Sequence, residues 1–306
     1  MTIIWGDVTE QNTSEVDLFG SIMQQNVIEN KLNRENAPLA TIQPSMAIEF
    51  TVKGANDLYL DLNKSRLHIF AKITKADGTN IDANTAASIK LTLHSMFREI
   101  GLEINNRNVG DTSQLYLYGS PLGTLRNFCK KTQEMRLVCE GWTKDTTRHI
   151  NVTAVGGNNA GLNARAETFA RSIVVKFICR PHLDVFNQEC LIPPNKDLHM
   201  KFSLSPNNFV RKLAEPGQGT PQENYKLLIQ SINLIIHTKK LTSRAHGSLK
   251  DLLVQQSMRH HLSRFQMKQL SIPANQTSIN WDNVVTCALP DLVIVGLVSD
   301  ADLVSG

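Results

Sequence analysis

The sequence contains no hydrophobic run long enough to cross a membrane. A transmembrane helix needs roughly 18 to 20 consecutive apolar residues, and no segment of the 306-residue chain approaches that length. The first residues, MTIIWGDVTEQNTSEVD, lack the basic stretch followed by a long apolar stretch that a secretory signal requires. These absences predict a protein without a membrane span that is made inside the cell and is not secreted.

Cysteine and an excess of charge are also scarce. The five cysteines are an odd number at wide spacing, which in a chain without a secretory signal indicates reduced thiols rather than a disulfide framework. Lys and Arg number 32 against 28 Asp and Glu, so the formal net charge is only +4. No global field therefore demands a nucleic-acid partner, although a local basic patch is compatible with this balance.

Sequence motifs that carry catalysis are missing. The chain has no GxxxxGK[ST] phosphate loop, no GxSxG elbow and no HExxH pair. One local group has metal-ligating residue types, namely Cys179, His182, Asp184 and Cys190. Zinc sites commonly use tight pairs of ligands from two places, and the second pair is missing here. We therefore expect no metal site and no cofactor.

An enzyme on a jelly-roll scaffold, as in cupins, would need several His and Glu ligands inside one barrel. The histidines on expected strands fall on the faces opposite the apolar ones: His68, His94, His199 and His237. This placement argues against an enzyme, and we expect no catalytic residue.

What the sequence does contain is a series of segments with a period of two. Residues 65–74 place Leu67, Ile69, Ala71 and Ile73 on one face, which is typical of a half-buried strand. Further strands are expected at 88–94, 172–179, 198–204, 226–237 and 292–298. A turn is expected at 76–78. Helices are expected from Ser120, with Pro121 as the first helical residue, and over 248–261.

These elements predict an all-β fold with few short helices, a jelly-roll β-sandwich. Residues 1–44, polar and rich in Asn and Gln, form an expected N-terminal arm. Residues 45–205 form a first jelly roll, 206–225 a linker rich in Pro and Gly, and 226–306 the start of a second jelly roll.

The second jelly roll is expected to be incomplete. A strand as apolar as Leu292–Val298 normally has a partner on each side within a sheet, yet only eight residues follow it. A jelly roll needs about eight strands, and residues 226–306 contain too few. We expect this strand to lie at a sheet edge or to pair with another chain.

A basic cluster near the start of this region is the candidate binding surface. Its residues are Lys239, Lys240, Arg244, Lys250, Arg259 and Arg264. The functional interpretation is contact with a polyanion such as a packaged genome. The alternative is a solvated loop and helix face, which the lack of interleaved aromatic residues favours.

Several segments together resemble the double jelly-roll major capsid proteins of Polinton (Maverick) elements, which are virus-like DNA transposons. Six segments are similar to parts of that family and occur in its order: 14–19 (SEVDLF), 57–79, 91–109, 180–204, 235–241 and 270–298. The most specific is 57–79, DLYLDLNKSRLHIFAKITKADGT. The first ten or so residues do not match, and the C-terminal strands of the family are absent.

The resemblance implies a structural protein. In the family, two jelly rolls per chain and three chains per capsomer form a pseudo-hexagonal tile of an icosahedral shell. The expected partners are therefore a homotrimer, other capsid proteins such as a penton, and packaged double-stranded DNA, and the expected location is the virion. The alternative is a host-retained, capsid-derived jelly roll that binds a ligand without assembling.

Overall fold

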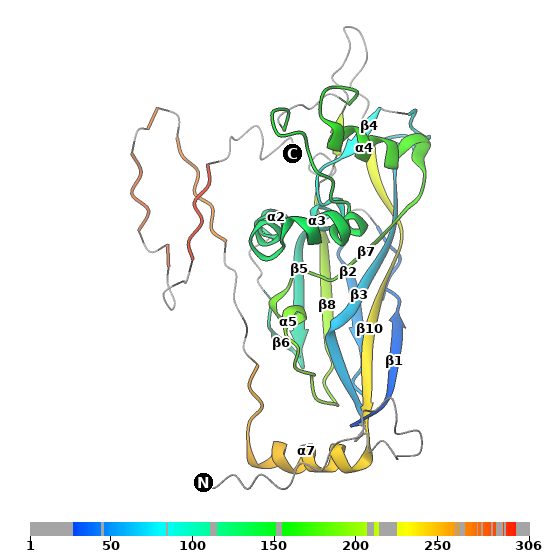
Figure 1. Ribbon diagram of the computed structural model, residues 1–306, viewed down its shortest axis with the longest axis vertical. Coiled ribbons are helices and arrows are strands. Elements are labelled where there is room, and N and C mark those ends of the chain that lie inside the picture. Colours follow the sequence, from blue (N-terminus) through cyan, green and yellow to red (C-terminus); the bar gives the residue numbers. More distant parts are fainter. Residues whose placement is uncertain are drawn as a thin grey trace, which may run out of the picture.

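The computed structural model describes residues 27–43, 46–83, 85–110, 115–150, 155–206, 211–213 and 225–260, with shorter stretches between 262 and 297. The described part is elongated, and its main strands run along the long axis (Figure 1). None of the described helices combines the length and the apolar character that crossing a membrane requires.

The first sheet has four antiparallel strands in the order β1-β10-β3-β7. Their bounds are Ile28–Asn36 for β1, Tyr225–Leu241 for β10, Leu58–Lys75 for β3 and Val175–Cys179 for β7. The two longest strands, β3 and β10, pair along most of their length at the centre of this sheet. The turn expected after β3 is confirmed, since Gly78 has a φ of 87° and its N–H donates to the carbonyl of Lys75.

The second sheet also has four antiparallel strands, in the order β2-β8-β5-β6. Their bounds are Ile48–Val52 for β2, Leu198–Leu204 for β8, Phe97–Ile104 for β5 and Arg107–Asn108 for β6. A small third sheet pairs β4, Ala86–Ser88, with β9, Arg211–Leu213.

One apolar core lies between the two large sheets. The period of two in the sequence places Leu67 and Ile69 of β3 and Ile232 of β10 on the buried face of the first sheet. Phe50 of β2 and Phe202 of β8 meet them from the second sheet, with their ring centroids 5.6 Å apart. Two antiparallel sheets that enclose one core form a β-sandwich, which confirms the expected fold class.

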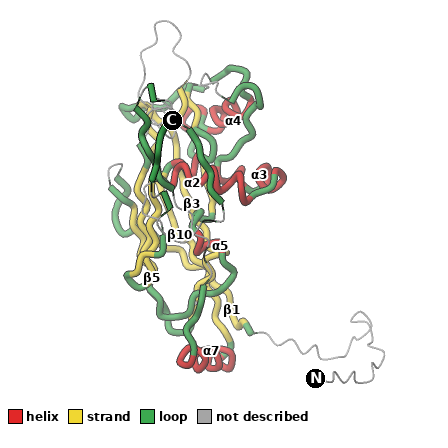
Figure 2. Tube along the Cα trace, turned by 90° about the vertical axis from the view of Figure 1, so that its left-hand side faces the viewer, coloured by secondary structure: helices red, strands yellow, loops and turns green. Residues whose placement is uncertain are grey.

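The helices are short and lie outside this sandwich (Figures 1 and 2). Among the described residues, the α-helices are α1 Thr92–Ser95, α2 Tyr116–Asn127, α3 Lys130–Met135, α4 Ala160–Thr168, α5 Asp184–Asn187 and α7 Ser243–Gln255. The same residues include the 3₁₀ helices η1 Leu137–Glu140 and η2 Ala170–Ser172. Helix α7 lies at one end of the molecule, and α4 lies with β4 at the other (Figure 1).

Both expected helices exist, but each begins earlier than the sequence indicated. Helix α2 starts at Tyr116 and contains Pro121 in its interior. Pro121 has no N–H to donate, whereas the N–H groups of Tyr118 and Gly119 donate to the carbonyl of Leu115 and hold the preceding turn. Helix α7 starts at Ser243, five residues before the expected Ser248.

The strand expected at 88–94 is wrong. After β4 the chain turns at Leu91, whose φ of 57° is left-handed, and then enters α1. Leu91 packs with Leu137 and Trp142 in a small separate cluster, while Leu93 joins the main core. Residues 91–97 are all buried, so the expected alternation between a buried and an exposed face is absent here.

The expected division of the chain also differs from the observed pairing. Residues 28–36, placed in the N-terminal arm, form β1 on the edge of the first sheet. Strand β10, expected to open a second jelly roll, pairs with β3 and buries Ile232 and Leu234 in the same core. Residues 211–213 of the expected linker form β9, whereas most of that linker lies outside the described residues.

The apolar segment near the end of the chain forms no strand in its described part. Residues 292–297 have no assigned secondary structure, and Leu292 and Val295 are 52% and 86% exposed. The strand expected at 292–298 is thus wrong for these residues, and Val298 lies outside the described part. Apolar, β-branched composition favours a strand only where a partner strand and a core are at hand.

Candidate functional site

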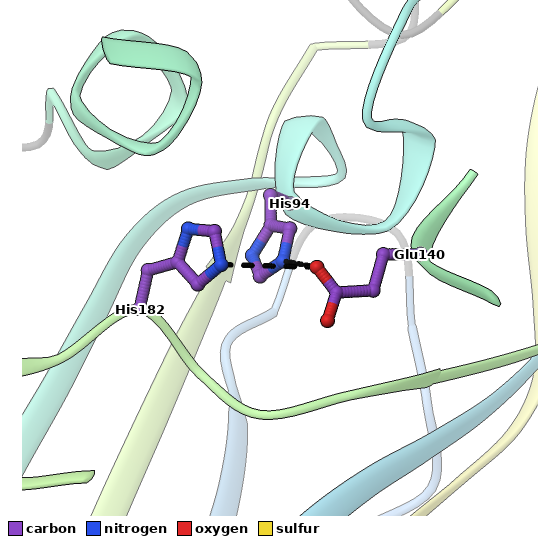
Figure 3. A group of neighbouring side chains, drawn as sticks. All are labelled: His94, Glu140 and His182. Carbon is purple, nitrogen blue, oxygen red and sulfur yellow. Dashed lines mark hydrogen bonds and ion pairs between the residues drawn. The ribbon is translucent and has the colours of Figure 1, made fainter. Parts of the chain in front are cut away.

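Three ionisable side chains from separate segments meet beside the sandwich. His94 lies in α1, Glu140 ends η1, and His182 follows β7 in the loop before α5. Figure 3 shows that both imidazole rings point toward the carboxylate of Glu140. We call His94, Glu140 and His182 the buried triad. One nitrogen of each imidazole and one carboxylate oxygen lie within 4.8 Å of one another.

Both imidazoles approach the same carboxylate oxygen of Glu140. Oε2 of Glu140 lies 3.0 Å from Nε2 of His94 and 3.7 Å from Nε2 of His182. The shorter distance is a hydrogen bond, while the longer one exceeds hydrogen-bond range. The two imidazole rings stack, with centroids 3.9 Å apart and planes 25° from parallel.

Helix α2 fixes the other nitrogen of each ring. Nδ1 of His94 lies 2.8 Å from the hydroxyl of Tyr116, and Nδ1 of His182 lies 2.7 Å from the hydroxyl of Ser120. Tyr116 and Ser120 are four residues apart and therefore share one face of the helix. The Tyr116 hydroxyl also accepts a hydrogen bond from the backbone N–H of His182. One helix face thus orients both rings.

Burial dominates the electrostatics of the triad. The side chains of His94, Glu140 and His182 are 1%, 3% and 15% exposed. Burial lowers the pKa of His94 to about 3, and burial together with the neighbouring His94 lowers the pKa of His182 well below its ordinary value. At neutral pH both imidazoles are therefore uncharged, and the contact between His94 and Glu140 is a hydrogen bond rather than an ion pair.

Burial raises the pKa of Glu140 as well, and neighbouring side chains oppose this rise. His182, Arg136, Arg180 and Arg66 each lower the pKa of this carboxyl group. Among the described residues, no Lys or Arg nitrogen lies within the 4.0 Å of a salt bridge to Glu140. The arginines thus act on the carboxylate from a distance, and the imidazoles are its direct partners.

Sequence reasoning missed this group. His94, expected on the polar face of a strand, is fully buried in α1. His182 was grouped with Cys179, Asp184 and Cys190, but the structure unites it with residues far away in the chain. Cys179 is buried at the end of β7, and Cys190 is exposed.

The basic cluster is distributed over two environments. Lys239 and Lys240 lie in β10, where Lys239 is 2.7 Å from Asp61 and Lys240 is 3.4 Å from Glu29. Arg244 and Lys250 are exposed on α7, and Arg259 is exposed beyond it. Arg264 lies outside the described residues. Lys239 is thus neutralised by its partner, while Arg244, Lys250 and Arg259 present their charge to solvent.

Comparison with solved structures places this fold among viral capsid proteins. One chain in the cryo-EM structure of the Sputnik virophage matches with a TM-score of 0.51 and 10% identity over 79% of this chain and 53% of that chain. The mavirus major capsid protein matches with a TM-score of 0.41 and 11% identity, over 79% of this chain and 52% of that chain. The capsid of the virus PBCV-1 matches with a TM-score of 0.46 and 12% identity, over 75% of this chain and 46% of that chain.

The chain thus spans about half the length of the solved chains that it matches. No protein-family model matches the sequence. No curated protein matches it either. The matched structures are double jelly-roll capsid proteins, which are structural proteins rather than enzymes. At these identities the likeness concerns the fold alone, and the match to the Sputnik virophage chain supports a jelly-roll β-sandwich.

Proposed function

We propose that this protein is a structural major capsid protein that forms part of a virus-like shell. The observation that carries the proposal is the shared fold with the Sputnik virophage chain. That fold places two antiparallel sheets around one core and leaves sheet edges for neighbours, as β1 does here. Sheet edges in soluble proteins are managed by cover, closure or pairing, and assembly supplies such pairing. The protein is then made inside the cell and functions in the virion.

The finer proposal is a trimeric capsomer of a Polinton (Maverick) element or a related DNA virus. Six sequence segments that resemble that family in its order support it. In this arrangement three chains form one pseudo-hexagonal tile, and other capsid proteins, such as a penton, close the shell around double-stranded DNA. The second jelly roll of each chain would begin within residues 226–306.

A second candidate is a capsid-derived binding module that does not assemble. The exposed cations Arg244, Lys250 and Arg259 on and beyond α7 favour it, because they are available to a polyanion. This candidate predicts a stable monomer with salt-dependent ligand binding, whereas the capsid proposal predicts self-association.

Electron microscopy of the purified full chain tests the proposal. Negative-stain images are expected to show closed shells or flat arrays of pseudo-hexagonal tiles as protein concentration is raised. Nuclease treatment of such particles, followed by extraction, measures any enclosed double-stranded DNA. Dispersed single chains at every concentration would contradict a capsid role and favour the binding module.

A further inference from the structure

We propose that His94, Glu140 and His182 bind one divalent transition-metal ion of the chemical class of Zn²⁺. This inference goes beyond the proposed capsid role and does not depend on it. Two imidazole nitrogens and one carboxylate oxygen are a donor set that zinc uses in proteins. They come from α1, η1 and the loop after β7, so the ion would join three segments of the chain.

The two distances from the carboxylate to the imidazoles are close to those between ligands of one ion. A tetrahedral ion that holds its ligand atoms at roughly 2.1 Å places those atoms about 3.4 Å from one another. Oε2 of Glu140 lies 3.0 Å and 3.7 Å from the two Nε2 atoms, on either side of that value. The longer contact leaves Nε2 of His182 without a hydrogen bond to the carboxylate. An ion between the three atoms would satisfy both imidazoles at once.

The surroundings of the triad match those of metal-binding histidines. Such histidines use their second ring nitrogen in a hydrogen bond that fixes the ring and its tautomer. Both rings here do so through Nδ1, to the hydroxyl groups of Tyr116 and Ser120. A hydroxyl can either donate or accept, so on metal binding the proton through which Nε2 of His94 bonds Glu140 can be replaced by one on Nδ1, and both Nε2 lone pairs are then free for the ion.

Nearby charge limits the strength of metal binding. The positive charges of Arg66, Arg136 and Arg180 act on the same carboxylate and oppose a second cation. The ion therefore competes with this positive field, and we expect a weaker affinity than that of a zinc finger.

The two imidazole rings must also change their relative orientation to bind an ion. Imidazole planes that are 25° from parallel must open further for both Nε2 lone pairs to reach one ion. His182 is the ring that would have to tilt, because it stands in a loop and its side chain is 15% exposed. The tilt would also change its stacking on Phe128, whose ring centroid lies 5.9 Å away. His94 is held in the interior.

The experiment uses the full chain, stripped with a chelator and then titrated with Zn²⁺ or Co²⁺ alone. We expect one equivalent of metal per chain, a visible Co²⁺ absorption of four-coordinate type, and a rise in the unfolding midpoint with free Zn²⁺. Glu140→Gln keeps an acceptor for His94 and is expected to abolish stoichiometric binding. Ser120→Ala removes the hydrogen bond to Nδ1 of His182 and is expected to weaken binding by about 10- to 100-fold.

His199→Gln is the matched control. His199 lies 3.5 Å from Glu49 and 3.9 Å from Glu103, but on the exposed surface of β8. The His199→Gln variant should bind as much metal as the unmodified chain. The proposal is overturned if the unmodified chain takes up no stoichiometric metal and shows no Co²⁺ absorption. It is equally overturned if Glu140→Gln binds metal normally, or if His199→Gln alone abolishes binding.

Discussion

The ammonium group of Lys239 lies 2.7 Å from a carboxylate oxygen of Asp61, and this ion pair joins β10 to β3. The two side chains are only 13% and 5% exposed. The sequence predicted that Lys239 belongs to a polyanion-binding surface, but its charge is paired with that of Asp61 within the sheet. The pair lies where the register of β3 and β10 shifts, next to the bulge between Asp61 and Arg66.

Replacement of Lys239 by Met is expected to destabilise the fold by about 3 kcal/mol, because it leaves the Asp61 carboxylate buried without its cation. Chemical denaturation measures the free energy of unfolding. Lys240→Met is the control, since the pair of Lys240 with Glu29 is solvent-exposed and its loss should cost less than about 1 kcal/mol. Equal losses of unfolding free energy for the two variants would show that the buried ion pair of Lys239 stabilises the fold no more than an exposed pair does.

The basic residues outside the sheet give a separate prediction for DNA binding. Arg244, Lys250 and Arg259 are exposed. If they contact phosphates, replacing all three with Ala should weaken binding to double-stranded DNA. It should also lower the slope of log affinity against log salt by up to about 3, because each phosphate contact contributes roughly 0.9. Fluorescence anisotropy over a salt series measures both.

The matched control for DNA binding replaces three exposed basic residues elsewhere, Arg126, Lys130 and Lys131 around the end of α2 and the start of α3. These replacements should leave affinity and salt slope unchanged. An equal effect of both triple variants would mean that binding follows overall charge and that α7 forms no specific surface.

A close backbone approach makes Gly54 sensitive to substitution. A Cβ atom at Gly54 would lie 2.6 Å from the backbone nitrogen of Lys196 and 2.8 Å from the carbonyl carbon of Asn195. Backbone atoms cannot move away as a flexible side chain can, so Gly54→Ala is expected to cost roughly 1–3 kcal/mol. Gly101→Ala in β5 is the control, because its nearest neighbour would lie at 3.8 Å, an ordinary contact. Thermal unfolding of both variants tests this, and no difference between them would contradict the observed packing.

Asp197 provides a prediction for pH. Its pKa is lowered first by a hydrogen bond from the N–H of Gly54 and then by one from Lys53, at 2.8 Å and 2.9 Å. A carboxyl group whose pKa is lower in the folded state stabilises the fold above its unfolded pKa, and this contribution is lost as pH falls through the folded pKa. Asp197→Asn should therefore lower the unfolding midpoint at neutral pH. The difference should shrink as pH falls below the ordinary Asp pKa of 3.8 and vanish once pH is below the lowered pKa of the folded state.

Unfolding scans from neutral to acidic pH measure this dependence. Asp251→Asn on the exposed face of α7 is the matched control for the loss of one exposed carboxylate. A stability difference for Asp197→Asn that persisted unchanged into strong acid would show that the effect does not come from the ionised carboxylate.

The sequence predicted those strands whose burial alternates along one straight segment. Strand β8 has the expected bounds, Leu198–Leu204, and β3 and β10 are longer versions of expected strands. The strand predicted at 88–94 is wrong because the chain makes a left-handed turn at Leu91 and then enters α1, where apolar and polar residues are buried alike. Alternation of apolar and polar residue types alone does not reveal such a turn.

The buried triad could not be predicted from the sequence, for a different reason. His94 and Glu140 are 46 residues apart, and neither forms a local ligand pair. Their meeting depends on the packing of α1 and η1 beside α2, which no periodicity encodes. The one available signal was the leucine spacing around His94, which indicated burial nearby but was interpreted as the opposite face of a strand.

The most direct test of the capsid proposal is the absolute mass of the chain in solution, measured by light scattering after size exclusion. The account predicts a species of three times the chain mass of 34.1 kDa, or larger particles, with three-fold images in the same fractions. A stable monomer of 34.1 kDa at all concentrations would contradict the capsid proposal and favour the binding module.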